Sequence, residues 1–210
     1  MSELLVNEIF SSVQGEGFHT GKLAIFVRFA GCNLRCSFCD TKYAWDTSKS
    51  SKLSVNEVLV LVEGERKKFG SKFVVLTGGE PLVQEFSSLQ ELVRSLKKAG
   101  YYVAMESNGT ILFDREKLPI DWLTISPKTD LFNPKGEELK LLYDGGQNLV
   151  FYEQFDFSFF YLQPILPENI QGLVGQWKEV KEAFRQVLEA VRKHPRWRVS
   201  FQVHKLVGWE

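Results

Sequence analysis

The 210-residue sequence lacks an excess of charge of either sign and lacks long apolar runs. Lys and Arg total 26, as do Asp and Glu, so the formal net charge is zero, which argues against a sequence-independent grip on nucleic acid. The sequence has no stretch of about 18 apolar residues, which a membrane-spanning helix would need. The first residues also lack the basic and apolar regions of a signal peptide. We therefore expect a soluble, cytoplasmic protein that binds neither nucleic acid nor membrane.

The chain also lacks the even number of spread-out cysteines that is typical of a disulfide framework. Its three cysteines, Cys32, Cys36 and Cys39, all lie in segment 31–41, and no fourth cysteine exists. Thiolates are the usual ligands of iron–sulfur clusters, and three thiolates on a four-iron cube leave one iron open to another ligand. An open iron suits catalysis better than electron carriage. The spacing therefore favours a catalytic [4Fe–4S] site.

Three cysteines and one histidine can also hold a structural zinc ion. His19, His194 and His204 are the candidate fourth ligands in this chain. Structural zinc sites often use paired C-x2-C knuckles, and this sequence has none. A non-catalytic zinc-binding module is therefore the alternative to a cluster-dependent enzyme.

Short apolar, β-branched runs alternate with amphipathic stretches, as in a parallel α/β protein. The expected strands are 4–10, 23–29, 72–76, 101–105, 122–125, 149–152, 159–162 and 197–203. The expected helices are 54–69 and 87–100, each opened by a capping box (Ser54–Glu57 and Ser87–Gln90), and 177–193. A closed eight-stranded barrel typically takes about 250 residues. The sequence therefore predicts a single domain, 1–210, with an open, partial (β/α)6 TIM-like barrel.

The chemically unusual segments all follow predicted strands. They are 31–41, 77–81, 105–109, 126–128 and 163–164. Because the carboxyl ends of parallel strands meet at one edge, where the sites of such folds assemble, we expect these segments to converge there.

The C-x3-C-x2-C loop and Gly78-Gly79-Glu80-Pro81 together resemble the radical S-adenosylmethionine superfamily, whose GGEP motif holds the methionyl amino group. Further segments resemble the 7-carboxy-7-deazaguanine synthases: Phe10–Gly17 with its Gln-Gly-Glu-Gly end, Ala24–Cys32, Cys39–Thr41, Glu106–Thr110, Ser126–Lys128, Gln163–Pro164 and Gln202–Lys205. The resemblance covers essentially the whole chain, although nothing is carried over from 42–75 and 129–160.

This resemblance implies the barrel of the radical S-adenosylmethionine type. It implies a lyase that converts 6-carboxy-5,6,7,8-tetrahydropterin to 7-carboxy-7-deazaguanine with release of ammonia, on the way to queuosine and other 7-deazapurines. The implied cofactors are a [4Fe–4S] cluster, S-adenosylmethionine and Mg²⁺, and the implied partners are a flavodoxin-like electron donor and a second copy in a homodimer. Another small radical enzyme, such as a glycyl-radical activase, is an alternative, against which the Gln-Gly-Glu-Gly and Gln-x-His-Lys segments speak.

The resemblance also assigns residues. Cluster ligands are expected to be Cys32, Cys36 and Cys39, and the magnesium ligand Thr41. Contacts with S-adenosylmethionine are expected from Phe38, Cys39, Asp40, Gly78, Gly79, Glu80, Glu106, Ser107, Ser126, Pro127, Lys128, Gln163 and Pro164. Substrate contacts are expected from Val13, Gln14, Gly15, Glu16, Arg28, Thr77 and His204.

Several of these residues have simpler alternatives. Ser107, Ser126–Lys128 and Gln163–Pro164 could only cap or punctuate turns. Thr41 could cap its loop through a bond between its hydroxyl and the backbone. Arg28 interrupts an apolar strand and needs an anionic partner, which could be a structural carboxylate rather than the substrate.

Overall fold

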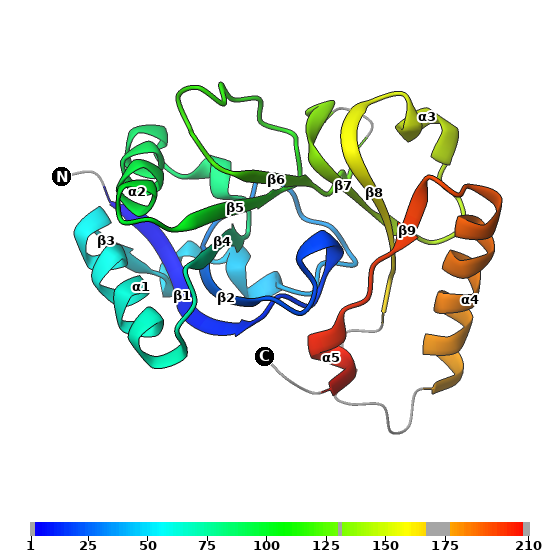
Figure 1. The fold of residues 1–210 in the computed structure, drawn as a ribbon, viewed down its shortest axis with the longest axis horizontal. Coiled ribbons are helices and arrows are strands. Elements are labelled where there is room, and N and C mark those ends of the chain that lie inside the picture. The colour runs from blue at the N-terminus through cyan, green and yellow to red at the C-terminus, as the bar shows by residue number, and fades with distance from the viewer. Residues whose placement is uncertain (1–2, 130–131, 167–176, 208–210) are drawn as a thin grey trace.

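The computed structural model describes residues 3–129, 132–166 and 177–207, which build one curved sheet with helices along its outer side (Figure 1). The strands are β1 (Leu4–Val13), β2 (Leu23–Phe29), β3 (Ser51–Leu53), β4 (Phe73–Gly78), β5 (Tyr102–Ser107), β6 (Trp122–Ile125), β7 (Lys135–Tyr143), β8 (Asp156–Pro164) and β9 (Trp197–Val199). The helices are α1 (Val55–Phe69), α2 (Phe86–Lys98), α3 (Leu149–Glu153), α4 (Trp177–Lys193) and α5 (Val203–Val207). Short 3-10 turns span Gly17–His19, Lys42–Trp45, Thr47–Lys49 and Pro81–Val83.

The nine strands lie in the order β3-β1-β2-β4-β5-β6-β7-β8-β9. All neighbours from β2 to β9 pair in parallel and follow one another in chain order, whereas β1 and β3 add antiparallel pairs at one edge. Among the described residues, β9 does not pair with β3 or β1, so the sheet stays open. This arrangement confirms the predicted open, barrel-type α/β fold.

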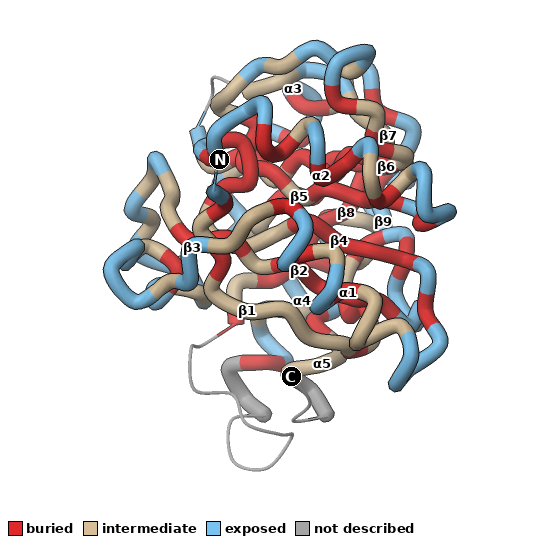
Figure 2. The backbone as a smooth tube through the Cα atoms, turned by 90° about the vertical axis from the view of Figure 1, so that its left-hand side faces the viewer, coloured by how far each residue is buried: buried red, intermediate tan, exposed pale blue. Residues whose placement is uncertain are grey.

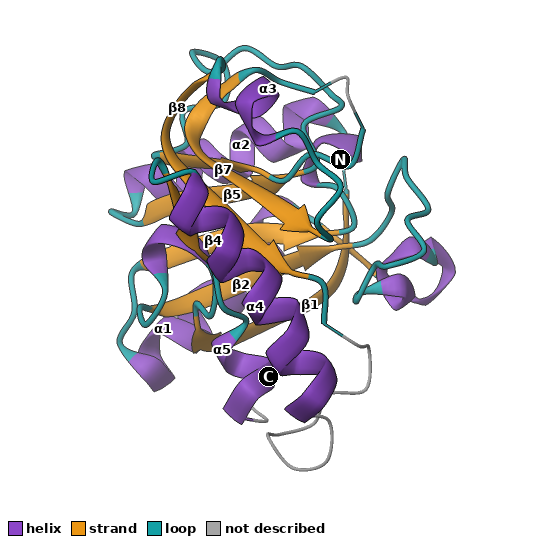
Figure 3. Ribbon diagram, turned by 90° about the vertical axis from the view of Figure 1, so that its right-hand side faces the viewer, coloured by secondary structure: helices purple, strands orange, loops and turns teal. Residues whose placement is uncertain are grey.

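The main core lies between the outer face of the sheet and the helices. Alternate strand residues such as Val27, Leu76 and Met105 point outward and are fully buried. In Figure 2 the buried stretches follow the central strands and the exposed ones follow the loops. Each fully buried aliphatic side chain contributes roughly 1.5–3 kcal/mol of transfer free energy. Helix α4 packs along β8 and β9 on this outer side (Figure 3).

The opposite, concave face changes character along the strands. Near the amino ends its side chains are apolar, among them Phe26, Val75 and Ala104. One step further along each strand the inward-facing residues become polar, as at Thr77 and Glu106. Because side chains alternate between faces, each polar residue points to the same side as the apolar one two positions earlier. The carboxyl end of the barrel interior is therefore polar.

Helix α1 begins with the predicted capping box and ends at the predicted glycine. The Ser54 hydroxyl accepts a hydrogen bond from the Glu57 amide, and the Glu57 carboxylate accepts one from the Ser54 amide (3.3 and 2.8 Å). Gly70 ends the helix in the left-handed region at φ 78°. The predicted bounds of β2, β6 and α4 are also confirmed. Within the described ranges, no helix combines the length and apolar character needed to cross a membrane.

Two predictions about local structure are wrong. The capping box at Ser87–Gln90 does not form, because the Glu85 carboxylate caps α2 and accepts bonds from the Ser87 and Ser88 amides (3.0 and 2.7 Å). The predicted strand at 149–152 is helix α3, whose first turn is capped by the Asn148 side chain. In both cases the side chain just before the helix accepts hydrogen bonds from first-turn amides.

The end of the chain also differs from expectation. Strand β9 stops at Val199 rather than at Val203, and the chain continues into α5, which carries His204. Strands β3 and β7 were not predicted, because their sequences, SKL and KGEELKLLY, show no clean apolar run. The helical periodicity of 177–193 also predicts that Trp177 and Leu188 lie on its apolar face. Leu188 is 55% exposed, which contradicts that prediction, and the side chain of Trp177 lies outside the described residues.

Candidate active site

A cavity of about 370 Å³ opens at the carboxyl end of the barrel. The residues predicted for the site that line it are Val13, Gln14, Gly15, Glu16, Arg28, Cys32, Cys36, Phe38, Cys39, Asp40, Thr41, Thr77, Gly78, Gly79, Glu106, Ser107, Ser126, Lys128, Gln163, Pro164 and His204. Glu80 and Pro127 are the predicted site residues that do not line it. The structure therefore brings together segments from both ends of the sequence, as the pattern of strand ends predicts.

The cysteine loop leaves β2 and enters this cavity. All three thiols are free and partly exposed, and the loop turns through a hydrogen bond from the Cys39 amide to the Cys36 carbonyl (3.1 Å). Burial raises the pKa of the Cys32 and Cys36 thiols, and for Cys36 the nearby Lys128 ammonium opposes that effect. Three free thiols on one loop that faces a cavity fit a [4Fe–4S] cluster with one open iron.

Gly78 and Gly79 lie directly beneath this loop. The sequence predicts that these glycines admit the methionyl group, and the structure gives a second reason for them. A Cβ on Gly79 would lie 1.9 Å from the Gly31 carbonyl oxygen, and the next amide, that of Glu80, donates to that same oxygen (2.9 Å). The glycines therefore let β4 support the cluster loop backbone to backbone, as well as line the cavity.

The Glu80 side chain is fully buried and points into the protein. Its carboxylate accepts hydrogen bonds from the Ser107 hydroxyl (2.8 Å) and the amides of Asn108 (2.7 Å) and Leu82 (3.1 Å). Burial raises the pKa of Glu80, while these hydrogen bonds act in the opposite direction. The carboxylate thus ties the end of β4 to the end of β5, and any contact of Glu80 with the cofactor has to come from its backbone.

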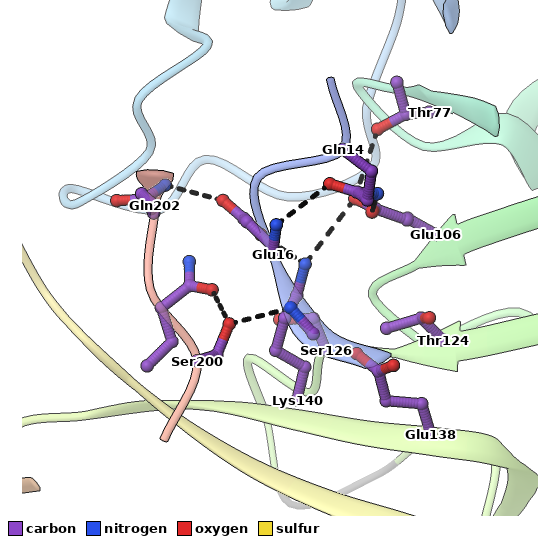
Figure 4. Close-up of polar contacts among 12 residues, drawn as sticks. Gln14, Glu16, Thr77, Glu106, Thr124, Ser126, Glu138, Lys140, Ser200 and Gln202 are labelled. Carbon is purple, nitrogen blue, oxygen red and sulfur yellow. Dashed lines mark hydrogen bonds and ion pairs between the residues drawn. The ribbon is translucent and has the colours of Figure 1, made fainter. Parts of the chain in front are cut away.

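The hairpin segment 14–17 lies over the cavity and contacts strand β5 (Figure 4). The Gln14 side-chain nitrogen (Nε2) donates a hydrogen bond to the Glu106 carboxylate (2.9 Å), and the Gln14 side-chain oxygen accepts one from the Glu16 backbone amide (3.1 Å). The Thr77 hydroxyl lies 3.5 Å from the other Glu106 oxygen. Glu106, predicted to contact S-adenosylmethionine, therefore belongs to the same hydrogen-bonded group as the predicted substrate residues Gln14 and Thr77.

Arg28 has a protein partner as well as a place in the cavity wall. Its Nε donates to the Glu8 carboxylate (2.6 Å), which also accepts from the Tyr43 hydroxyl (2.7 Å). Burial raises the pKa of Tyr43 to about 12, and its hydrogen bond to Glu8 acts in the same direction. The structural salt bridge foreseen as an alternative is present, and it holds Arg28 at the cavity rather than away from it.

The C-terminal segment ties the hairpin to the cluster loop. The Gln202 amide nitrogen donates to Glu16 (2.7 Å) and lies 3.2 Å from Asp40, and the Lys205 ammonium donates to Asp40 (2.5 Å). Burial alone would raise the pKa of Asp40, but the Lys205 ammonium and these hydrogen bonds hold it well below its usual range. His204 lies beside Gly15, whose carbonyl accepts a bond from the Val203 amide (3.1 Å).

Several residues of the cavity wall were not predicted. They include Tyr43, Asn108, Lys140, Gln202 and Lys205. Lys140 was missed because it lies in β7, within the stretch from which nothing was carried over. The available signal was the charged pair Glu138 and Lys140, two positions apart in a segment that otherwise reads as a strand.

Glu138 sits below the cavity and is 2% exposed. Burial raises its pKa to about 7, against the attraction of Lys140 and a hydrogen bond from the Phe18 amide (2.9 Å). A carboxyl group whose pKa is higher in the folded state than in the unfolded state favours folding while it is protonated. Its contribution to the free energy of unfolding is fully present below the unfolded-state pKa and is lost as pH rises through the folded-state pKa.

Replacing Glu138 by Gln should therefore leave the free energy of unfolding nearly unchanged at about pH 5 and raise it by about 1–3 kcal/mol above about pH 7.5. The reason is that Gln has no proton to lose, while it keeps an oxygen that can accept from Phe18. Denaturant unfolding of both proteins across this range measures the effect. A difference that is constant with pH would contradict it.

Comparison with known proteins agrees with this geometry. Residues 26–194 match the Radical SAM superfamily, and the chain therefore belongs to that superfamily. A 7-carboxy-7-deazaguanine synthase from Bacteroides thetaiotaomicron is 39% identical, with 96% of each chain covered, and one from Burkholderia multivorans is 36% identical, with 97% of each covered. Within the superfamily, the chain belongs to the family of the 7-carboxy-7-deazaguanine synthases.

A solved structure supports the same assignment, and a second one shares the fold. The crystal structure of QueE from Escherichia coli superposes with a TM-score of 0.70 at 25% identity, covering 95% of this chain and 93% of that one. Streptococcus suis SuiB bound to S-adenosylmethionine, at 13% identity and a TM-score of 0.50, shares the fold. As a radical S-adenosylmethionine enzyme, the chain uses a [4Fe–4S] cluster and S-adenosylmethionine, and neither the zinc module nor the glycyl-radical activase is favoured.

Proposed function

We propose that the chain converts 6-carboxy-5,6,7,8-tetrahydropterin to 7-carboxy-7-deazaguanine with release of ammonia, as a step toward queuosine or another 7-deazapurine. The observation that carries this proposal is that one cavity is lined both by the cysteine loop and by the hairpin segment 14–16 with Arg28 and Glu106. A radical formed at the cysteine loop and a polar heterocycle held by the hairpin would thus meet in the same enclosed space.

When bound, the cluster and S-adenosylmethionine supply a 5′-deoxyadenosyl radical that removes a hydrogen atom from the substrate. Cys32, Cys36 and Cys39 hold the cluster. The backbone of Gly78 and Gly79 and the polar strand ends bind S-adenosylmethionine.

The protein's own side chains orient the pterin. The carboxylate of Glu16 and the backbone of the hairpin accept hydrogen bonds from the N–H groups of the pterin edge. Arg28, held by Glu8, offers its guanidinium to the substrate carboxylate, and His204 on α5 also lines the cavity and faces the substrate.

The direct test is anaerobic reconstitution followed by incubation with the carboxytetrahydropterin, S-adenosylmethionine, Mg²⁺ and dithionite. Mass spectrometry should show 7-carboxy-7-deazaguanine and one ammonia per product. A fully clustered protein that cleaves S-adenosylmethionine but leaves the pterin unchanged would refute the substrate while leaving the radical chemistry in place.

Thr41 is proposed as the magnesium ligand. It caps the turn Lys42–Trp45 by its backbone position alone, because its hydroxyl makes no capping bond and instead donates to the Asp40 carboxylate (3.0 Å). A hydroxyl and a carboxylate side by side are hard oxygen ligands of the kind Mg²⁺ prefers, usually together with substrate oxygens and waters.

Replacing Thr41 by Ala should raise the Mg²⁺ concentration needed for half-maximal rate by about tenfold, because one ligand is lost. A magnesium titration of the initial rate measures the shift, with cluster content as a check. Thr41→Ser keeps the oxygen and should behave like the parent. If the half-point stays the same in Thr41→Ala, Thr41 is not a ligand, and Asp40 becomes the residue to test.

The remaining features of the assembly are also proposals. We infer one radical S-adenosylmethionine domain over residues 1–210, a homodimer and a cytoplasmic location. The reductant is proposed to be a flavodoxin-like one-electron donor, which has to approach the cluster loop, where Arg35 and Phe38 are exposed. Sedimentation analysis and reduction assays with purified flavodoxin test these points.

A further inference from the structure

Lys140 is a buried cation that lines the cavity and makes none of the cofactor or substrate contacts described above. It lies on β7, in register with Tyr161 on β8, and its side chain is 5% exposed. Its neighbours two positions away on the same face are Glu138 and Leu142. The side chain therefore points into the barrel interior, and Figure 4 shows it directed toward the hairpin and β5.

The Lys140 ammonium faces carboxylates from three elements. It makes an ion pair with Glu16 on the hairpin and lies 3.7 Å from the Glu106 Oε2 atom on β5. Glu138 on its own strand adds a third carboxylate below it. A buried ammonium is costly unless it is paired, and these carboxylates hold the pKa of Lys140 above its usual value although burial alone would lower it.

Glu16 depends on this cation more than on any other charged group. Burial would raise the pKa of Glu16, and the charge and hydrogen bond of Lys140 reverse that effect. The other titratable groups near this space belong to Asp40, to His204, whose pKa is lowered by burial, and to Lys128, whose pKa is lowered to about 8 by burial and by the Lys140 charge. Asp40 is already paired with Lys205.

Each oxygen of the Glu16 and Glu106 carboxylates has its own polar partner. One Glu16 oxygen accepts a hydrogen bond from Gln202 and the other accepts one from Lys140. One Glu106 oxygen accepts a hydrogen bond from Gln14, and the other lies near Thr77 and Lys140. Both residues also line the cavity. Lys140 is thus the group that these two carboxylates share.

We propose that Lys140 is a positioning residue for substrate recognition. Its ammonium holds Glu16 and Glu106 side by side as charged acceptors that face the N–H donors of the substrate's heterocycle. The inference rests on the proposed function, since it presumes that a pterin-type donor edge enters this cavity. It assigns Lys140 no contact with the cluster or with S-adenosylmethionine.

The test compares Lys140→Met with the parent holoenzyme. Met is similar in length and apolar, so it removes the charge and keeps most of the volume. We expect the KM for the carboxytetrahydropterin to rise about 30-fold or more, with a smaller change in kcat and unchanged cluster content and S-adenosylmethionine affinity. Lys97→Met is the matched control, because it removes a half-buried lysine–aspartate pair, with Asp121, outside the cavity.

A pH profile separates positioning from a merely structural role. Without Lys140, Glu16 should hold its proton to higher pH, so the ratio of variant to parent KM should be largest near about pH 6 and shrink toward about pH 8.5. Lys140→Arg keeps the charge and should show a ratio that does not vary with pH. A structural role would instead give Lys140→Met a ratio that is the same at every pH, and that result would overturn the proposal, as would a parental KM.

Lys140→Met leaves three carboxylates without their cation, so it could fail to fold. The double variant Lys140→Met, Glu138→Gln removes one of those buried charges and leaves Glu16 and Glu106 unpaired, and the same pH-dependent ratio is expected from it. Failure of the proposed function is a separate outcome. If the parent enzyme carries its cluster but makes no product, the proposed substrate is wrong. If the parent enzyme makes product and the double variant has the same KM, only the role of Lys140 is wrong.

Discussion

Replacing Cys36 by Ala should abolish the [4Fe–4S] cluster and lower product formation by at least about a thousandfold, because the difficult chemistry belongs to the cofactors. The chain has no other thiol that could replace the lost ligand, since Cys32 and Cys39 are its only other cysteines. Iron and sulfide analysis of anaerobically purified protein should fall from about four of each per chain to less than about one.

Ser37→Ala is the matched control for that variant. Ser37 is exposed in the same loop and is not a thiol, so its replacement should leave iron, sulfide and activity at parental levels. A Cys36→Ala protein that keeps four irons and four sulfides would show that Cys36 is not a ligand. Stoichiometric zinc without sulfide in the parent protein would contradict the cluster itself.

Replacing Gly79 by Ala should damage both the cluster loop and cofactor binding. The added Cβ would lie 1.9 Å from the Gly31 oxygen and 3.2 Å from the Cys32 Cβ, so the loop that carries the first cysteine has to move. We expect cluster content to fall to less than about half, S-adenosylmethionine affinity to fall about tenfold or more, and the free energy of unfolding to drop by about 1–3 kcal/mol.

Gly64→Ala provides the contrast. A Cβ at Gly64 meets no atom within 4 Å, and the residue lies inside helix α1, so this change should raise the free energy of unfolding by about 0.5–1 kcal/mol and leave activity unchanged. Iron analysis, equilibrium dialysis with S-adenosylmethionine and denaturant unfolding are the three measurements. A Gly79→Ala protein with a full cluster and weak S-adenosylmethionine binding would mean that the glycine serves the cofactor alone; parental values for both would remove its role in the site.

The sequence predicted the features that depend on residues close together in the chain. The capping box at Ser54, the strand bounds 23–29 and 122–125, and the arrival of separate loops at one sheet edge all depend on nearby residues or on strand alternation. The cysteine loop and the glycine pair could be recognised for the same reason.

The features that were missed depend on contacts between distant residues. Strand β9 ends early because Ser200 and Gln202 turn toward Gln163 and Glu16, and a run of apolar residues cannot reveal such partners. Lys140 looks like a surface charge in the sequence, and it becomes a buried one only when the hairpin folds over β7. The bonds that bury the Glu80 carboxylate are also long-range, because β5 delivers Ser107 and Asn108 to it.

The bonds that join the hairpin, the cluster loop and the C-terminal segment also bear on how the protein folds. Gln202 and Glu16 are 186 positions apart, and Lys205 and Asp40 are 165 apart, whereas neighbouring parallel strands follow one another along the chain. Closing such long loops costs entropy that local contacts cannot offset, so the floor of the cavity should assemble before its rim. Held by a few polar contacts rather than by a core, the rim should also be the first part to open. The contacts that surround the cavity should therefore be the last to form and the least stable of the fold.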